Sequence, residues 1–207
     1  MNTNLRFFLR EVVVQILSKE KLCYYYFSYP DKVLFLDIET EGLSKDRNDI
    51  TVIGIYHQGA YRPFIKGLNL HRAFEFLSVI PIWVTFNGEN FDIPFIKAKF
   101  PELSTPHLHI DLFQLTRAIG LKGGLKRIEK ALGITRKTEG MNGYDAVKLW
   151  RRWEDFGDKS ALRTLILYNR EDVVNLKRIM EHVGRLILGE AKNSFLLTLK
   201  QESMEGL

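Results

Sequence analysis

Asp37 and Glu39 are two acids that directly follow an apolar run, residues 33–36. Such a run predicts a buried strand, and residues two apart on a strand point to the same face of the sheet. Two neighbouring carboxylates at the edge of a core repel each other unless a cation or a shared proton neutralises them. Because acids are also common at strand ends, this short pattern alone leaves both interpretations open.

A third acid, Asp92, follows a predicted strand over residues 82–85 and opens the next predicted helix. That position lies above the carboxyl end of a strand, where open α/β sheets bind their ligands. An aspartate in the first turn of a helix also compensates the positive helix N-terminus. Asp92 taken singly therefore fits a ligand site and a structural role equally well.

A fourth acid, Asp172, lies four residues after Tyr168 in a long predicted helix, so both side chains share one face. The same face carries Leu165, Leu176 and Ile179, which directs Asp172 toward the core. A carboxylate on an apolar stripe costs free energy unless a partner neutralises it, and a metal ion is such a partner.

The elements that position these residues predict an α/β fold. Residues 33–39, 50–56 and 61–65 have strand patterns, with a turn over residues 57–60, and two more strands are expected at 82–85 and 107–110. Helices are expected at 70–79, 93–100 and 112–119, and everything beyond Gly124 has a helical pattern, including a long helix from about Ser160 to Leu188. Three strands in hairpin-like order and two in helical crossovers predict a mixed five-stranded sheet flanked by helices.

The chain has 207 residues and a formal charge of +5, which suits one globular domain with ample core. Residues 117–152 hold ten Lys or Arg and three Asp or Glu. The excess of positive charge in this segment is larger than the net charge of the whole chain. A basic segment beside a carboxylate cluster favours binding of a phosphate backbone over a merely solvated helix face. The single cysteine, Cys23, excludes an internal disulfide and a thiolate zinc site, and it favours a cytoplasmic compartment.

The expected organisation is an N-terminal extension over residues 1–30, a catalytic domain over 31–188 and a C-terminal tail over 189–207. An apolar stretch from Phe7 to Leu17 predicts an amphipathic helix that packs on the core or forms a homo-oligomer interface. No stretch reaches the roughly 20 apolar residues of a membrane span, so no membrane partner is expected.

Three motifs in order resemble those of the DnaQ-like (DEDD) 3′-to-5′ exonuclease superfamily, which has an RNase H-like fold. They are Asp37-Ile38-Glu39-Thr40, Asn87-x-x-x-Phe91-Asp92 and Tyr168-Asn169-x-x-Asp172. The tyrosine is typical of the DEDDy branch, because the histidine branch places its base five residues before the last aspartate, where this chain has Leu167.

This resemblance implies that Asp37, Glu39, Asp92 and Asp172 bind two divalent cations, Mg²⁺ or Mn²⁺. Tyr168 would orient the water that attacks the terminal phosphodiester. Thr40, Leu43, Asn87 and Phe91 would line the substrate groove, although Leu43 and Phe91 fit core packing equally well. The expected partners are 3′ ends of single-stranded DNA, with RNA less favoured.

Two other functions are compatible with the same residues. An endonuclease of the same fold, such as a resolvase or an RNase H, would use similar carboxylates and cut internally. A non-catalytic nucleic-acid-binding module would keep the fold, but four converging acids repel phosphate and serve no binding role. The sequence therefore favours the exonuclease.

Overall fold

The computed structural model describes the backbone of residues 19–205 and the side chains of residues 19–189. The chain divides into two units, one formed by Asp31–Ile179 and the other by Met1–Pro30 with Met180–Leu207. The predicted N-terminal amphipathic helix, Phe7 to Leu17, lies outside the described residues. None of the described helices combines the length and apolarity that crossing a membrane requires.

The larger unit is built on a five-stranded sheet with the strand order β3-β2-β1-β4-β5. β1 pairs antiparallel with β2, and β2 with β3, whereas β1–β4 and β4–β5 are parallel pairs. This confirms the predicted α/β fold with a mixed five-stranded sheet. The strands are β1 (Val33–Thr40), β2 (Ile50–His57), β3 (Ala60–Ile65), β4 (Ile82–Thr85) and β5 (Leu108–Asp111).

The turn between β2 and β3 is the tight hairpin that the sequence predicts. Gln58 and Gly59 both have positive φ, 48° and 80°. Two consecutive residues in that region define the type I′ geometry that matches the twist of a two-residue hairpin. This short connection fixes the register of β2 on β3, while the pairing of β2 with β1 places Gly54 opposite Asp37.

Most helices begin and end close to the predicted positions; residues 132–142 and the C-terminal end of α7 differ. The helices are α2 (Ala73–Val79), preceded by the 3₁₀ turn η2 (Leu70–Arg72), α3 (Asp92–Lys99), α4 (Leu112–Ala118), α5 (Leu125–Ala131), α6 (Gly143–Phe156) and α7 (Lys159–Glu205); a further 3₁₀ turn, η1 (Pro30–Lys32), precedes β1. Residues 132–142 form a loop, so the prediction of helix throughout this region is wrong. Gly133 has a positive φ of 68° just after α5, and Asn142 caps α6.

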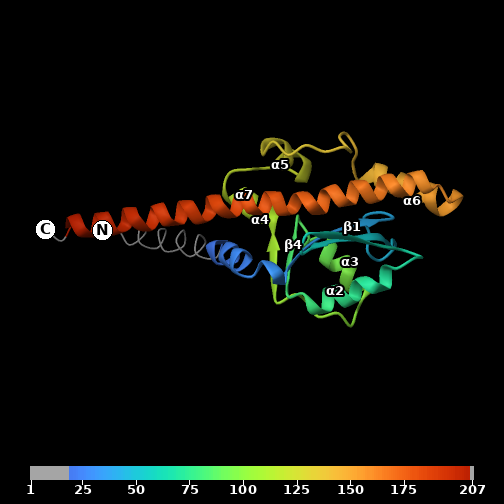
Figure 1. Cartoon of the computed structure of the whole chain (residues 1–207), viewed down its shortest axis with the longest axis horizontal. Helices are drawn as coiled ribbons and strands as arrows, with labels where there is room; N and C mark the ends of the chain where they lie inside the picture. The colour runs from blue at the N-terminus through green and yellow to red at the C-terminus, as the bar shows by residue number, and fades with distance from the viewer. Residues whose placement is uncertain (1–18, 206–207) are drawn as a thin grey trace. The chain divides into compact units, whose positions relative to one another are not determined.

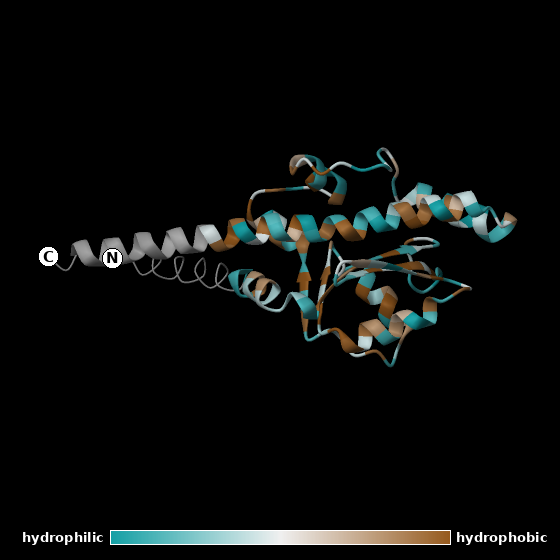
Figure 2. Ribbon diagram, in the orientation of Figure 1, coloured by the Kyte–Doolittle hydropathy of each residue, from teal (hydrophilic) through white to brown (hydrophobic). Residues whose placement is uncertain are grey.

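Two apolar clusters, one on each face of the sheet, hold the larger unit together. Strand residues including Leu34, Leu36 and Ile38 pack with α2 and α3, as Figure 1 shows for the arrangement of these elements. On the opposite face Val52 and Ile65 pack with α6 and the first part of α7. Figure 2 shows hydrophobic residues along the strands and α3, and alternating hydropathy along α7. Odd-numbered residues of β1 therefore face α7, which is the side on which Asp37 and Glu39 lie.

α7 continues to Glu205 through the stretch that the sequence separates as a tail. In the smaller unit, the last part of α7 lies close to a helix over residues 19–28. A Cβ atom at Gly184 would lie 2.9 Å from the ring of Phe27, so the absence of a side chain permits this approach. The predicted boundaries at residues 30 and 188 stay predictions.

Candidate active site

Three of the four predicted acids meet between β1 and α7. Asp37, Glu39 and Asp172 each offer one carboxylate oxygen, and these atoms all lie within 4.8 Å of one another. Asp37 and Glu39 reach this point because alternate residues of β1 face α7, and Asp172 because it lies on the sheet-facing side of that helix. We call these three residues the acid cluster; their oxygen-only donor set suits Mg²⁺ or Mn²⁺ better than zinc.

Asp92 lies beside the acid cluster and has a structural contact of its own. Its Oδ1 accepts a hydrogen bond of 3.1 Å from the backbone N–H of Ile38, between the two acids of β1. The pairing of β1 with β4 ends at Phe35, so the Ile38 N–H lies beyond the last paired residue on that side. Asp92 thus supports the end of β1 and opens α3, which gives it a structural role, while its role as a metal ligand stays a prediction.

The electrostatics of the acids show that they lack sufficient neutralisation. Burial raises the pKa of Asp37 well above its ordinary value, and the neighbouring carboxylates, Asp172 first, add to the rise. Burial, with Asp172 again, raises the pKa of Glu39. Burial also raises the pKa of Asp92 to about 7 and that of Asp172 to about 6. Bound divalent cations would remove this cost, so the residues present fit the metal site that the sequence predicts.

Asn169, on α7, contacts both acids of β1. Its Nδ2 lies 3.0 Å from Oδ2 of Asp37 and 3.4 Å from Oε1 of Glu39, while its Oδ1 accepts a 2.9 Å hydrogen bond from the Tyr61 hydroxyl. This fully buried amide fits only because position 54 has no side chain: a Cβ at Gly54 would lie 1.9 Å from Oδ1 of Asn169. The sequence motif includes Asn169, but this bridging role depends on the packing of α7 on β2.

Tyr168 lies at the edge of the acid cluster, where its hydroxyl is 2.6 Å from Nζ of Lys126 on α5. Burial, followed by the charges of Asp172 and Glu39, raises the pKa of the Tyr168 phenol well above its ordinary value. The phenol therefore keeps its proton, accepts a hydrogen bond from Lys126 and can donate one to a water or phosphate oxygen. With its proton retained, the Tyr168 hydroxyl is suited to orient a water molecule by a hydrogen bond rather than to abstract a proton from it.

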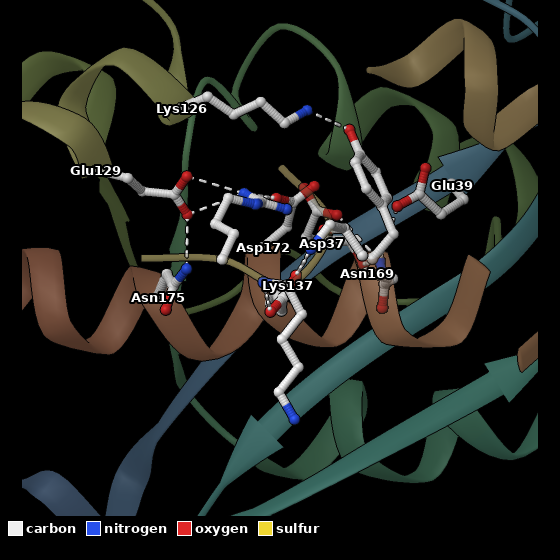
Figure 3. Close-up of polar contacts among 12 residues, drawn as sticks. Asp37, Glu39, Lys126, Glu129, Lys137, Asn169, Asp172 and Asn175 are labelled. Atoms are coloured by element: carbon white, nitrogen blue, oxygen red, sulfur yellow. Dashed lines mark hydrogen bonds and ion pairs between the residues drawn. The ribbon is translucent and has the colours of Figure 1, made fainter. Parts of the chain in front are cut away.

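A buried cation that the sequence did not reveal also contacts the acid cluster. Arg136, from the 132–142 loop, places Nη1 2.9 Å from both carboxylate oxygens of Glu129 and 2.5 Å from Oδ1 of Asp172. Glu129 in turn accepts a 2.8 Å hydrogen bond from Asn175 (Figure 3). Asp172 and Asn175 lie far from Arg136 in the sequence, and only the excess of basic residues in 117–152 hinted at this network.

The acid cluster opens into a cavity of about 530 Å³. All five predicted catalytic positions and all four predicted substrate positions line this cavity. Leu43 is 88% exposed, so core packing does not explain it, whereas Phe91 packs partly on the core and lies 5.0 Å from the Phe95 ring between centroids. The hydroxyl of Thr40 donates a 2.7 Å hydrogen bond to the Gly42 carbonyl, so it is already engaged within the chain.

The loop that carries Asn87 is fixed by Asp111. Its Oδ1 accepts hydrogen bonds from the N–H groups of Asn87, at 2.7 Å, and of Phe113, at 3.0 Å, and its Oδ2 accepts one from Glu89, at 3.3 Å. Asp111 is thus the N-cap of α4 and the anchor of the segment that leads into α3. By fixing the segment that precedes α3, Asp111 helps to position Asp92 at the start of that helix.

The fold and the acid cluster together define an α/β protein with an RNase H-like sheet and carboxylates at the end of its central strand. The family profile described as RNase_H superfamily matches residues 34–184, and the chain belongs to this superfamily. This confirms the predicted RNase H-like fold. Among curated proteins, no sequence matches the chain.

Solved structures of known proteins share the fold. The family B DNA polymerase from Pyrobaculum calidifontis is 19% identical with a TM-score of 0.55, over 81% of this chain and 25% of the polymerase. A structure described as the apo form of the nuclease is 18% identical, with a TM-score of 0.51, over 79% of this chain and 84% of its own. Brucella melitensis NrnC bound to pGG is 18% identical, with a TM-score of 0.51, over 86% of each chain. This chain thus spans a quarter of the polymerase and most of the two smaller proteins.

Proposed function

We propose that the chain is a metal-dependent 3′-to-5′ exonuclease of the DEDDy type, which acts on single-stranded nucleic acid and prefers DNA to RNA. The observation that carries this proposal is the convergence of the acid cluster, with Asp92 and Tyr168 beside it, on one open cavity. Membership of the RNase_H superfamily and the likeness to a nuclease, to NrnC and to a DNA polymerase support it.

The proposed reaction is hydrolysis of the last phosphodiester bond. Water attacks the phosphorus, the bond to the 3′ oxygen of the preceding nucleotide breaks, and that oxygen takes up a proton, which releases a nucleoside 5′-monophosphate. Two divalent cations held by Asp37, Glu39, Asp92 and Asp172 would supply charge neutralisation and acidify the attacking water. Tyr168 would orient that water, because its phenol retains a proton to donate.

The chain's own residues would also position the end of the strand. Thr40, Leu43 and Phe91 line the cavity, where the backbone of Thr40 would meet the terminal 3′ hydroxyl and the two apolar side chains would contact the terminal base. An intact duplex does not free its terminal nucleotide, so single strands and frayed ends are the expected substrates. The pGG bound by Brucella melitensis NrnC supports nucleic acid as the ligand of this cavity.

The test is a time course with a 5′-labelled single-stranded DNA oligonucleotide and Mg²⁺ or Mn²⁺. We expect a ladder that shortens from the 3′ end and disappears with EDTA and in the Asp37→Ala variant. Asp46→Ala is the matched control, because its side chain is 79% exposed and outside the cavity. Loss of a circular single strand would show an endonuclease instead, and binding without cleavage of DNA or RNA would show a binding module.

A further inference from the structure

Part of the cavity wall comes from α6, an element to which the proposed function gives no role. Gly143, Tyr144, Val147 and Arg151 line the cavity from this helix. Their spacing of three and four residues places them on one face of α6. The asparagine cap and its capping box with Asp145 fix where this helix begins, and so where that face points.

Arg151 gives this wall an unusual charge. Among the described residues that line the cavity, it is the only Lys or Arg, and the other charged side chains there are carboxylates. Arg151 is exposed, and the structure shows it in no hydrogen bond or ion pair within the described chain. Its guanidinium is therefore free to bind an anion that enters the cavity, in a geometry that suits the two oxygens of a phosphate.

Tyr144 adds a flat apolar surface beside this charge. It is 68% exposed, and Nζ of Lys148 lies 4.2 Å from its ring centroid, which restrains the ring on α6. Exposed aromatic rings next to a cationic side chain are the usual means by which proteins bind single-stranded bases. Leu43 presents the other strongly exposed apolar side chain of the cavity, on the loop that follows β1.

We propose that α6 binds the penultimate nucleotide of the substrate strand: Arg151 contacts the phosphate on its 5′ side, and Tyr144 stacks on its base. This inference rests on the proposed function, since it assigns the scissile phosphate to the acid cluster. The next phosphate then lies away from the metal site, where the acids alone would repel it. Arg151 offsets that repulsion and makes the enzyme sensitive to the second phosphodiester from the 3′ end.

The test uses an oligonucleotide in which the second linkage from the 3′ end is an uncharged methylphosphonate. Affinity is measured by fluorescence anisotropy with Ca²⁺ as the metal, and KM and kcat with Mg²⁺ or Mn²⁺. For the wild type we expect the modification to weaken binding about tenfold, as for loss of a charge-assisted hydrogen bond. For Arg151→Ala the natural and the modified strands should bind alike, and Arg151→Lys should restore part of the difference.

Arg152→Ala is the matched control. Arg152 is the next residue of α6, carries the same charge, pairs with Asp158 at 2.5 Å and does not line the cavity. This variant should keep the full tenfold effect of the methylphosphonate. For the base, an abasic site at the penultimate nucleotide should weaken binding by the wild type severalfold and leave Tyr144→Ala unaffected.

The outcomes separate the two proposals. If the wild type shortens DNA from the 3′ end and Arg151→Ala shows the same methylphosphonate effect as the wild type, the role of α6 is overturned and the exonuclease stands. If the wild type neither binds nor cuts single strands, the proposed function fails and the inference fails with it. If Arg151→Ala and Arg152→Ala reduce the methylphosphonate effect equally, the effect reflects the general charge of α6, and the proposed role of Arg151 is overturned.

Discussion

Nη1 of Arg136 lies 2.5 Å from Oδ1 of Asp172, so the protein places a cation of its own against one of its metal-binding candidates. Glu129 binds that arginine on the other side and in turn accepts a hydrogen bond from Asn175. The charge of Arg136 partly opposes the rise in the pKa of Asp172 that burial causes. A divalent ion at the acid cluster must therefore share Asp172 with Arg136 or displace it.

Replacing Arg136 by Gln should tighten metal binding and weaken the fold. The acid cluster would lose a neighbouring positive charge, so we expect Mn²⁺ affinity to rise about tenfold by isothermal titration calorimetry. Glu129 would remain buried without its ion partner, which costs about 3 kcal/mol in free energy of unfolding. Arg170→Gln, on the exposed side of α7, removes the same charge as a control. Unchanged Mn²⁺ affinity in Arg136→Gln would contradict this account.

Replacing Asp37 by Asn should abolish activity and stabilise the metal-free protein. Removing one carboxylate relieves the repulsion that raises the pKa of its neighbours, so the free energy of unfolding in EDTA should increase by about 1–2 kcal/mol. Activity should fall at least a hundredfold, on the order of the several kcal/mol that metal-based charge stabilisation provides. Thermal unfolding with EDTA and with Mg²⁺ measures both effects, because only the wild type should gain strongly from Mg²⁺. If the metal-free Asp37→Asn protein is less stable than the wild type, repulsion among the carboxylates of the acid cluster does not destabilise the fold.

The metal-free protein should lose stability as the pH rises from 5 to 7.5. The pKa of Asp172 in the folded state is about 6 and that of Asp92 about 7, against roughly 3.9 in the unfolded chain. The folded state thus binds more protons in this window, and the free energy of unfolding falls by about 1.4 kcal/mol per pH unit for each such proton. Saturating Mg²⁺ should flatten this dependence, because metal binding releases the protons.

Thermal melts in EDTA across this pH range measure that slope. Acids whose pKa is lowered by their partners, such as Glu41 and Asp49, act in the opposite direction, but only below about pH 4.5. Burial also lowers the pKa of His109, which opposes the buried acids within this window, so the melts use a His109→Gln background in which the window from 5 to 7.5 reports the acids. A melting temperature that rises with pH in EDTA would show that these carboxylates are neutralised within the chain.

Replacing Leu43 by Ser should reduce activity without affecting stability. The side chain is 88% exposed, so its removal changes the free energy of unfolding by less than about 0.5 kcal/mol. If Leu43 supports the terminal base, KM for single-stranded DNA should rise severalfold. Leu68→Ser is a control at a residue that is 59% exposed and outside this cavity. Equal KM values for both variants would remove Leu43 from the substrate site.

The strands and the acids on β1 were predictable because their signals are local. Apolar runs, the His57–Ala60 turn and the spacing of Asp37 and Glu39 each act within a few residues. Alternation along β1 placed both acids on one face, and the four-residue spacing did the same for Tyr168 and Asp172. All nine predicted site residues, four of which came from the resemblance to the exonuclease motifs, line one cavity, while their roles stay predictions.

The network around Arg136 was not predictable because it depends on tertiary packing. Residues 132–142 have a composition compatible with helix, and only Gly133 and the Asn142 cap reveal that the chain leaves one helix and starts another. Lys126 and Glu129 lie one turn apart on α5 and reach different members of the site, Tyr168 and Arg136. The sequence shows such charges only as part of a basic segment.

The acid cluster depends on a position without a side chain, Gly54, as well as on its carboxylates. The amide of Asn169 occupies the space where a side chain on β2 would be, and from there it bonds to Asp37 and Glu39. A designer who transplanted the carboxylates to another sheet would have to transplant this empty position as well. Without it, α7 would be held further from β1, and the carboxylate of Asp172 would no longer lie close to those of Asp37 and Glu39.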